Sequence, residues 1–75
     1  MAIAFILLNV KMGSEDQALK EVESLPEVKE AYRVYGTYDT IVKVESADFA
    51  KVRNVIDRIR GIKEIRSTLT LIVNG

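Results

Sequence analysis

The strongest constraint on the fold is the order of hydrophobic patterns, which is strand, helix, strand in each half of the chain. Residues 3–10 form an almost unbroken apolar run that ends beside Gly13, and a run this short indicates a strand rather than a helix. A helix follows as far as Leu25, because Pro26 forces the residue before it out of the helical region. The second strand is predicted at residues 28–35.

The second half repeats this order, with a third strand at residues 40–45, a second helix and a last strand at residues 65–73. Either Ser46 or Asp48 caps the second helix, since both side chains accept hydrogen bonds from first-turn N–H groups. Apolar residues at helical spacing predict its buried stripe: Phe49, Val52, Val55, Ile56 and Ile59.

A capping box opens the first helix, with Ser14 at the cap and Gln17 three residues later. In such a box the hydroxyl and the amide side chain each bond a backbone N–H group at the helix start. The helix that follows buries one stripe of apolar side chains, namely Ala18, Leu19, Val22 and Leu25.

Together these elements predict an α+β fold, the ferredoxin-like βαββαβ sandwich, in which two helices cover one face of a four-stranded antiparallel sheet. The other face has no cover from this chain. Because residues 3–10 are apolar on both sides, either Ile3, Phe5 and Leu7 or the alternate row lies there, with one row of the last strand. An open apolar face is an interaction surface, so we expect dimerisation through the sheets.

The composition argues against several classes of protein and site. The chain has eleven basic and eleven acidic residues, and no Cys or His. The usual ligands of zinc and iron are therefore absent, and no motif supports the alternative of an all-carboxylate Mg²⁺ or Ca²⁺ site, so we expect no metal and no cofactor. A balanced charge argues against a nucleic-acid binder, whose affinity comes largely from excess Lys and Arg. The basic residues of the second helix fit a solvated face.

The apolar start of the chain, residues 2–8, is too short to span a membrane. It also lacks the basic leader and small-residue cleavage site of a signal peptide. We therefore expect a cytoplasmic protein without membrane association. A chain of this length buries only about 60% of its unfolded surface, so self-association is the expected further source of stability.

Residues 35–39 carry the densest group of side chains suited to binding: two phenols, a hydroxyl and a carboxylate around a glycine. Gly36 tolerates positive φ and lets a ligand approach the backbone. Free N–H groups of such a turn can hold a carboxylate, and Asp39 can hold an ammonium group. The alternative is a plain turn in which Asp39 caps its own backbone. We expect no catalytic residues, because the chain has no His, no Cys nucleophile and no Gly-rich phosphate loop, and most of its carboxylates fit a solvated face.

The same segment carries a resemblance to a known family. Val34, Gly36, Tyr38 and Asp39, followed by an alternating strand, resemble the effector domain of the Lrp/AsnC transcriptional regulators, also called the RAM domain. Weaker matches are spread along the chain, at residues 25–28, residues 41–44, Ile62, Ser67 and Thr68.

The resemblance implies both a function and a site. Members of this family dimerise through their sheets, often form rings of dimers, and bind free amino acids between dimers around the loop after the second strand. Carried over to this chain, the ligand-binding residues are Gly36, Thr37, Tyr38, Asp39, Ser67 and Thr68, with Tyr35 as a neighbour. Residues 1–75 show no counterpart of the family's helix-turn-helix. We therefore expect a single effector domain that does not bind DNA directly and can join full-length regulators of the family.

Three functions remain open from the sequence. One is an amino-acid-binding oligomeric module that modulates amino-acid-responsive transcription through partner proteins. The second is a small oligomeric enzyme of the dimeric α+β barrel type, which would need an acid or base with a perturbed pKa in a cavity between paired sheets. The third is a structural assembly protein without a ligand.

Overall fold

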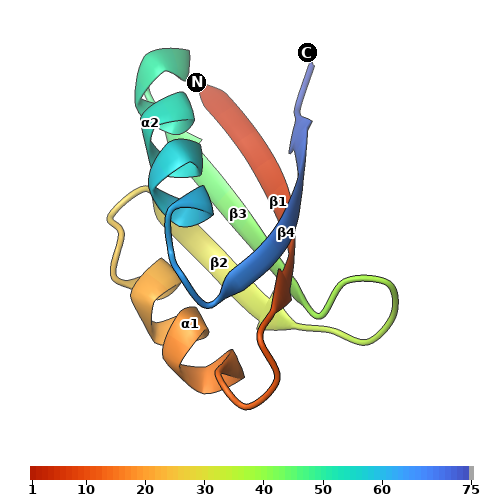
Figure 1. The fold of residues 1–75 in the computed structure, drawn as a ribbon. Coiled ribbons are helices and arrows are strands. Elements are labelled where there is room, and N and C mark those ends of the chain that lie inside the picture. Colours follow the sequence, from red (N-terminus) through yellow and green to blue (C-terminus); the bar gives the residue numbers. More distant parts are fainter. Residues whose placement is uncertain (75) are drawn as a thin grey trace.

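The elements of the structure follow the predicted order of strand, helix, strand, strand, helix, strand (Figure 1). The computed structural model describes residues 1–74. Its elements are β1 (Ala2–Val10), α1 (Glu15–Glu23), β2 (Val28–Arg33), β3 (Thr40–Ser46), α2 (Phe49–Arg60) and β4 (Ile65–Ile72). β4 stops one residue before its predicted end, at the pair that Ile72 forms with Ala4. The predicted α+β fold is confirmed.

The strands form one antiparallel sheet in the order β2-β3-β1-β4, so β1 and β3 lie in the middle. Figure 1 shows both helices on the same face of this sheet. α1 packs against β2, and α2 packs across β1, β3 and β4. The opposite face is not covered by any element of residues 1–74.

The β2–β3 hairpin ends earlier than the sequence predicts. Arg33 opposite Thr40 is its last pair, so β2 stops two residues before the expected end at Tyr35. The N–H group of Val34 still donates to the carbonyl oxygen of Asp39 at 2.9 Å and closes the base of the loop. Tyr35 therefore belongs to the loop rather than to the strand.

The core lies between the sheet and the helices, and β1 supplies its centre. Ala4, Ile6, Leu8 and Val10 alternate along β1 toward the helices and are buried. They pack with buried residues of β3, both helices and the segment after α1: Val42, Val44, Ala18, Val22, Leu25, Val52, Val55, Ile56 and Ile59. Most of the two predicted helical stripes is therefore confirmed as core.

The start of α1 differs from the predicted capping box. Ser14 is the N-cap residue, but its side chain makes no cap hydrogen bond. Its φ of −110° and ψ of 11° depart from the extended conformation in which a capping hydroxyl reaches the first turn. The N–H group of Gly13 donates instead to Oε1 of Glu15 at 2.9 Å. The predicted hydroxyl cap is wrong, and Leu19 of the predicted stripe is only half-buried.

The start of α2 settles the choice between the two predicted caps. The backbone of Asp48 is extended, and its Oδ1 accepts the N–H group of Lys51 at 2.9 Å, so Asp48 rather than Ser46 is the cap. Phe49 departs from the predicted buried stripe and is 47% exposed. It stands in the first turn, ahead of Val52, the first residue of α2 that the sheet buries.

The uncovered face of the sheet is apolar over β1 and β4. Ile3, Phe5 and Leu7 alternate with the buried row of β1 and therefore point away from the helices. Residues directly opposite in neighbouring strands share a face, and Leu7 lies opposite Ile41 and Leu69. We call this surface the open apolar strip; it consists of Ile3, Phe5, Leu7, Ile41, Leu69 and Leu71.

Toward β2 the same face becomes polar. The hydroxyl of Tyr32 donates to Oε1 of Glu30 at 2.7 Å, and Nζ of Lys43 lies 3.6 Å from Oε2 of the same carboxylate. The bond from Tyr32 lowers the pKa of the Glu30 carboxyl, and the carboxylate raises the pKa of the Tyr32 phenol. Both shifts hold these groups in the protonation states that they have at neutral pH.

Replacing Asp48 by Ala should destabilise the protein by about 1 kcal/mol, since removing an N-cap acceptor costs about 0.5–2 kcal/mol. Ser14→Ala is the matched control at the other helix. Because the Ser14 side chain makes no cap bond, we expect little change. Urea unfolding followed by circular dichroism at one protein concentration measures both. Equal losses in the two variants would contradict the assignment of the caps.

Candidate functional site

The loop between β2 and β3 projects beyond the end of the sheet (Figure 1). Gly36 has a φ of +137°, a backbone conformation that residues with a Cβ rarely adopt. A Cβ added at Gly36 would meet nothing within 4 Å, so the glycine is required by the backbone and not by a crowded neighbour. Tyr35 is fully exposed beside it. The loop is therefore shaped by its backbone and open to a ligand or a second copy.

Asp39 ties the base of this loop to the end of β1. Its N–H group donates to the carbonyl oxygen of Leu8 at 3.0 Å. Its carboxylate accepts the N–H group of Val10 at Oδ2 and the hydroxyl of Thr40 at Oδ1, each at 3.2 Å. A carboxylate has room for about four hydrogen bonds, so Asp39 keeps acceptor capacity beyond this structural role.

A hollow of about 200 Å³ lies beside the loop, and we call it the loop hollow. Its lining residues are Glu15, Arg33, Val34, Tyr35 and Asp39. Two carboxylates and one guanidinium group meet there, so the lining carries charges of both signs. Nη1 of Arg33 pairs with Oδ1 of Asp16 at 3.0 Å, and both side chains are largely exposed.

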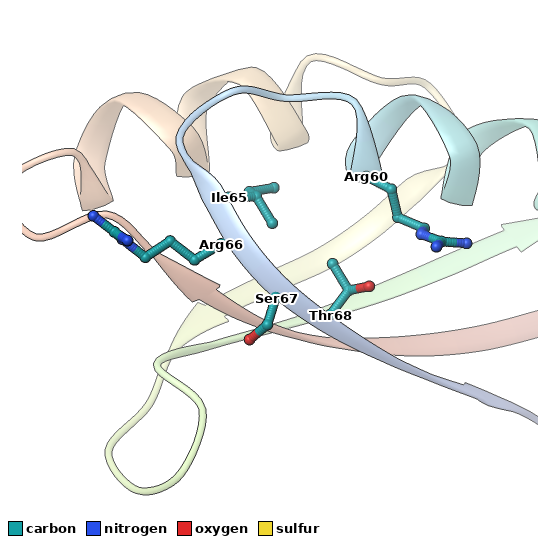
Figure 2. A pocket seen from close by; sticks show the side chains of 5 residues that line it. All are labelled: Arg60, Ile65, Arg66, Ser67 and Thr68. Atoms are coloured by element: carbon teal, nitrogen blue, oxygen red, sulfur yellow. The ribbon is translucent and has the colours of Figure 1, made fainter.

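A second hollow, of about 330 Å³, lies at the start of β4, and we call it the β4 hollow. It is lined by Arg60, Ile65, Arg66, Ser67 and Thr68 (Figure 2). Ser67 lies opposite Asn9 and Thr68 opposite Leu8, so their side chains point to different faces of the sheet. Nδ2 of Asn9 donates to Oγ of Ser67 at 3.1 Å.

The structure does not bring all the predicted site residues together, and those that line a hollow are split between these two. Tyr35 and Asp39 line the loop hollow, and Ser67 and Thr68 line the β4 hollow. β3 and β4 flank β1, so Asp39 and Ser67 are separated by two strand spacings, about 10 Å. Gly36, Thr37 and Tyr38 line neither hollow.

Four charged residues that line the hollows were missed by sequence reasoning: Glu15, Arg33, Arg60 and Arg66. Glu15, Arg60 and Arg66 lie far along the chain from the loop residues, and only the fold brings them to the same end of the molecule. The one signal in the sequence is that Arg33 comes directly before the loop.

Two other kinds of feature, a metal-binding cluster and a membrane-spanning helix, are absent from the described part of the chain. Within residues 1–74, no three His, Cys, Asp or Glu side chains gather where they could hold a metal ion. None of the helices in the same range has the length and apolar character needed to cross a membrane.

Comparison with known proteins identifies regulatory and biosynthetic relatives. The HTH-type transcriptional regulator FL11 of Pyrococcus furiosus is 32% identical over 71 residues, which cover 95% of this chain and 47% of the regulator. This chain thus spans about half the length of that relative. Homocitrate synthase of Sulfurisphaera tokodaii is 39% identical over 70 residues, covering 89% of this chain but only 15% of the enzyme.

A solved structure and a family model extend over almost the whole chain. The crystal structure of FFRP-DM1 is 41% identical and superposes with a TM-score of 0.91, covering 99% of this chain and all of that one. The family model described as Lrp/AsnC ligand binding domain matches residues 3–74. These matches confirm the resemblance seen in the sequence, and the chain belongs to the Lrp/AsnC ligand-binding domain family.

Proposed function

We propose that this chain is a cytoplasmic, oligomeric effector module that binds a free α-amino acid and modulates amino-acid-responsive transcription through partner proteins. The observation that carries the proposal is the lining of the loop hollow, where Arg33 lies with Glu15 and Asp39. An amino acid at neutral pH is a zwitterion, so it needs a cation and an anion in one small space. The family match supports a regulatory ligand-binding module.

The contacts of these residues suggest a role for each. Arg33 would take the α-carboxylate through its planar pair of N–H groups. Its present partner is Asp16, but an exposed ion pair contributes only about 0–1 kcal/mol and can be exchanged for a ligand. Asp39, with acceptor capacity left, and Glu15 would take the ammonium group.

The remaining predicted residues would complete the site from a neighbouring copy. The backbone N–H groups of Gly36, Thr37 and Tyr38 can hold an anion, but these residues do not line the loop hollow of their own chain. Ser67 and Thr68 are equally remote from it. A ligand that touches all of them therefore has to lie between copies, as in a ring of dimers.

The open apolar strip would form the dimer. It joins half-buried side chains of β1 to Leu69 and Leu71, which are 42% and 49% exposed. Exposed apolar area of this kind on a small soluble domain marks an interaction surface. A second copy placed sheet to sheet covers it without disturbing either helix.

DNA reading would lie outside residues 1–75, in full-length relatives that join the same assembly. The FL11 regulator is named as a transcriptional regulator, and this chain matches about half of it. The neutral charge of the chain supports this division of roles, since DNA affinity depends largely on excess basic residues.

A second candidate function is effector control of a biosynthetic enzyme. The match to homocitrate synthase, over 89% of this chain, supports it, since a similar segment occurs there within an enzyme. An active site in the module itself has less support. Glu30 and Tyr32 on the open face have shifted pKa values, but the shifts hold Glu30 charged and Tyr32 neutral, away from acid-base work at neutral pH.

Calorimetry with the standard amino acids should find at least one that binds. The Asp39→Asn variant should bind that amino acid at least tenfold more weakly. The substitution removes the charge that would hold the ammonium group, and losing a charged hydrogen bond costs about 1.5–3 kcal/mol, at about 1.4 kcal/mol per tenfold. The amide oxygen can still accept the N–H group of Val10. Asp57→Asn, on the exposed side of α2, is the control and should bind as the wild type does. Absence of any binding at millimolar amino acid would rule out the sensor function.

Sedimentation at micromolar concentration should show a dimer or larger assembly, and Leu7→Asp should shift it to a folded monomer. The new charge would lie unpaired at the centre of the buried dimer interface. Met12→Asp adds the same charge to a side chain that is 90% exposed and should leave the assembly intact. If Leu7→Asp unfolds the chain, Leu71→Lys on the edge strand tests the same surface. A folded wild-type monomer would contradict the proposed interface.

Residues 1–75 alone should not shift DNA in a mobility assay at physiological salt. The eleven basic charges are matched by eleven acidic ones, so little counterion release is available. A shifted band that weakens steeply with salt would overturn this expectation. Neutral variants of Arg53 and Arg58 would then show whether α2 contacts the phosphates.

A further inference from the structure

The β4 hollow differs from the loop hollow in its chemistry, because its charged and hydroxyl side chains are all hydrogen-bond donors. Arg60 comes from the end of α2 and Arg66 from β4, and Figure 2 shows them on opposite sides of the strand that carries the two hydroxyls. No carboxylate lines the hollow. An ammonium group would find no anion there, whereas a carboxylate would find one guanidinium group on either side of the strand.

The donors of this hollow are free to serve a ligand. The described residues form ion pairs at Arg33 and Lys43, and neither Arg60 nor Arg66 takes part in one. Asp57, one turn before Arg60, is not paired with it. Ser67 already accepts a hydrogen bond from Asn9 at its oxygen, which leaves its hydroxyl proton available for an acceptor.

We propose that the effector is an acidic amino acid, and that its side-chain carboxylate is held by Arg66 and the Ser67 hydroxyl of a neighbouring copy, which lie on the same side of β4 (Figure 2). This inference rests on the proposed function, since the loop hollow would hold the α-amino and α-carboxylate groups. The two hollows are complementary to the two ends of such a molecule: one carries both charges and the other only donors.

The neighbouring copy follows from the sheet order. Arg33 lies on β2 and Arg66 on β4, at opposite edges of the sheet. About 14 Å separates these edges, and the groups also lie on different faces. Arg33 pairs with Asp16 of α1, whereas Ser67 lies opposite Asn9, in the row of β1 that points away from the helices. One ligand can therefore reach both kinds of hollow only where the loop hollow of one copy faces the β4 hollow of another.

Calorimetry with glutamate, glutamine, aspartate and asparagine tests the ligand class. We expect one of the acids to bind at least tenfold more tightly than its amide, because the amide loses a charge-assisted bond of the kind that contributes about tenfold or more. Arg66→Gln should remove this preference and leave the affinity for the amide unchanged. Arg60→Gln removes a charge on the other side of β4 and should keep the preference. Arg53→Gln removes the same charge from the same helix as Arg60 but outside the hollow, and should keep the preference.

Co-expression of two variants tests where the second carboxylate lies. Asp39→Asn alone and Arg66→Gln alone should both lose tight acid binding. Assemblies that contain both should regain part of it, because some sites then combine an intact loop hollow with an intact β4 hollow. No recovery in mixed assemblies would overturn the placement on a neighbouring copy.

The possible failures are distinguishable. If a neutral or basic amino acid binds in a way that depends on Asp39 but not on Arg66, the acidic class is wrong and the proposed function stands. If no amino acid binds, the proposed function fails as well. Inorganic phosphate is the last ligand to test. If phosphate binds as tightly as the best acidic amino acid and Arg66→Gln abolishes this binding, the β4 hollow is a general anion site and the inference is wrong.

Discussion

The structure depends on the burial of β1, which is hydrogen-bonded to a strand on each side and apolar on both faces. One row of its side chains forms the centre of the core, and the other row lies in the open apolar strip. Since both helices cover the same face, this chain buries the apolar side chains on one face of β1 and leaves those on the other face without a covering layer. A strand that is apolar on both faces is usually covered on both, so in the proposed assembly the pattern that directs folding would also direct association.

The fold was predictable because it follows from periodicity. The alternation along residues 3–10 and the helical spacing of Val52, Val55, Ile56 and Ile59 reflect burial, which sequence patterns record well. Details that depend on local dihedral angles were not predictable. Ser14 has the right identity for a cap but the wrong backbone angles, and the hydrogen bond found at this helix start joins Glu15 to the N–H group of Gly13, ahead of the cap. Which row of β1 faces the helices was likewise decided by packing, since both rows are apolar.

The candidate site was predictable only where its residues are adjacent in the sequence. The motif around Gly36 and Asp39 could be found because a loop keeps its chemistry within a few residues. Glu15 and Arg33 are brought together by the packing of α1 against β2. The turn from α2 into β4 places Arg60 and Arg66 on the two sides of one hollow. The net charge of zero does not reveal this organisation, because it sums over the whole chain, whereas one hollow carries charges of both signs and the other only positive charge.

The bonds of Asp39 give the loop a link to the whole sheet. The N–H group that its carboxylate accepts belongs to Val10, where the register between β1 and β4 shifts, and the open apolar strip runs along the same strand. A ligand that draws on this carboxylate acts on the end of β1 and hence on the surface through which copies would meet. If the proposed site and interface are right, ligand binding and assembly would be thermodynamically linked. The linkage would be reciprocal: the factor by which the ligand strengthens association equals the factor by which association raises the affinity for the ligand. The protein concentration in the cell would then set the effector concentration to which the module responds.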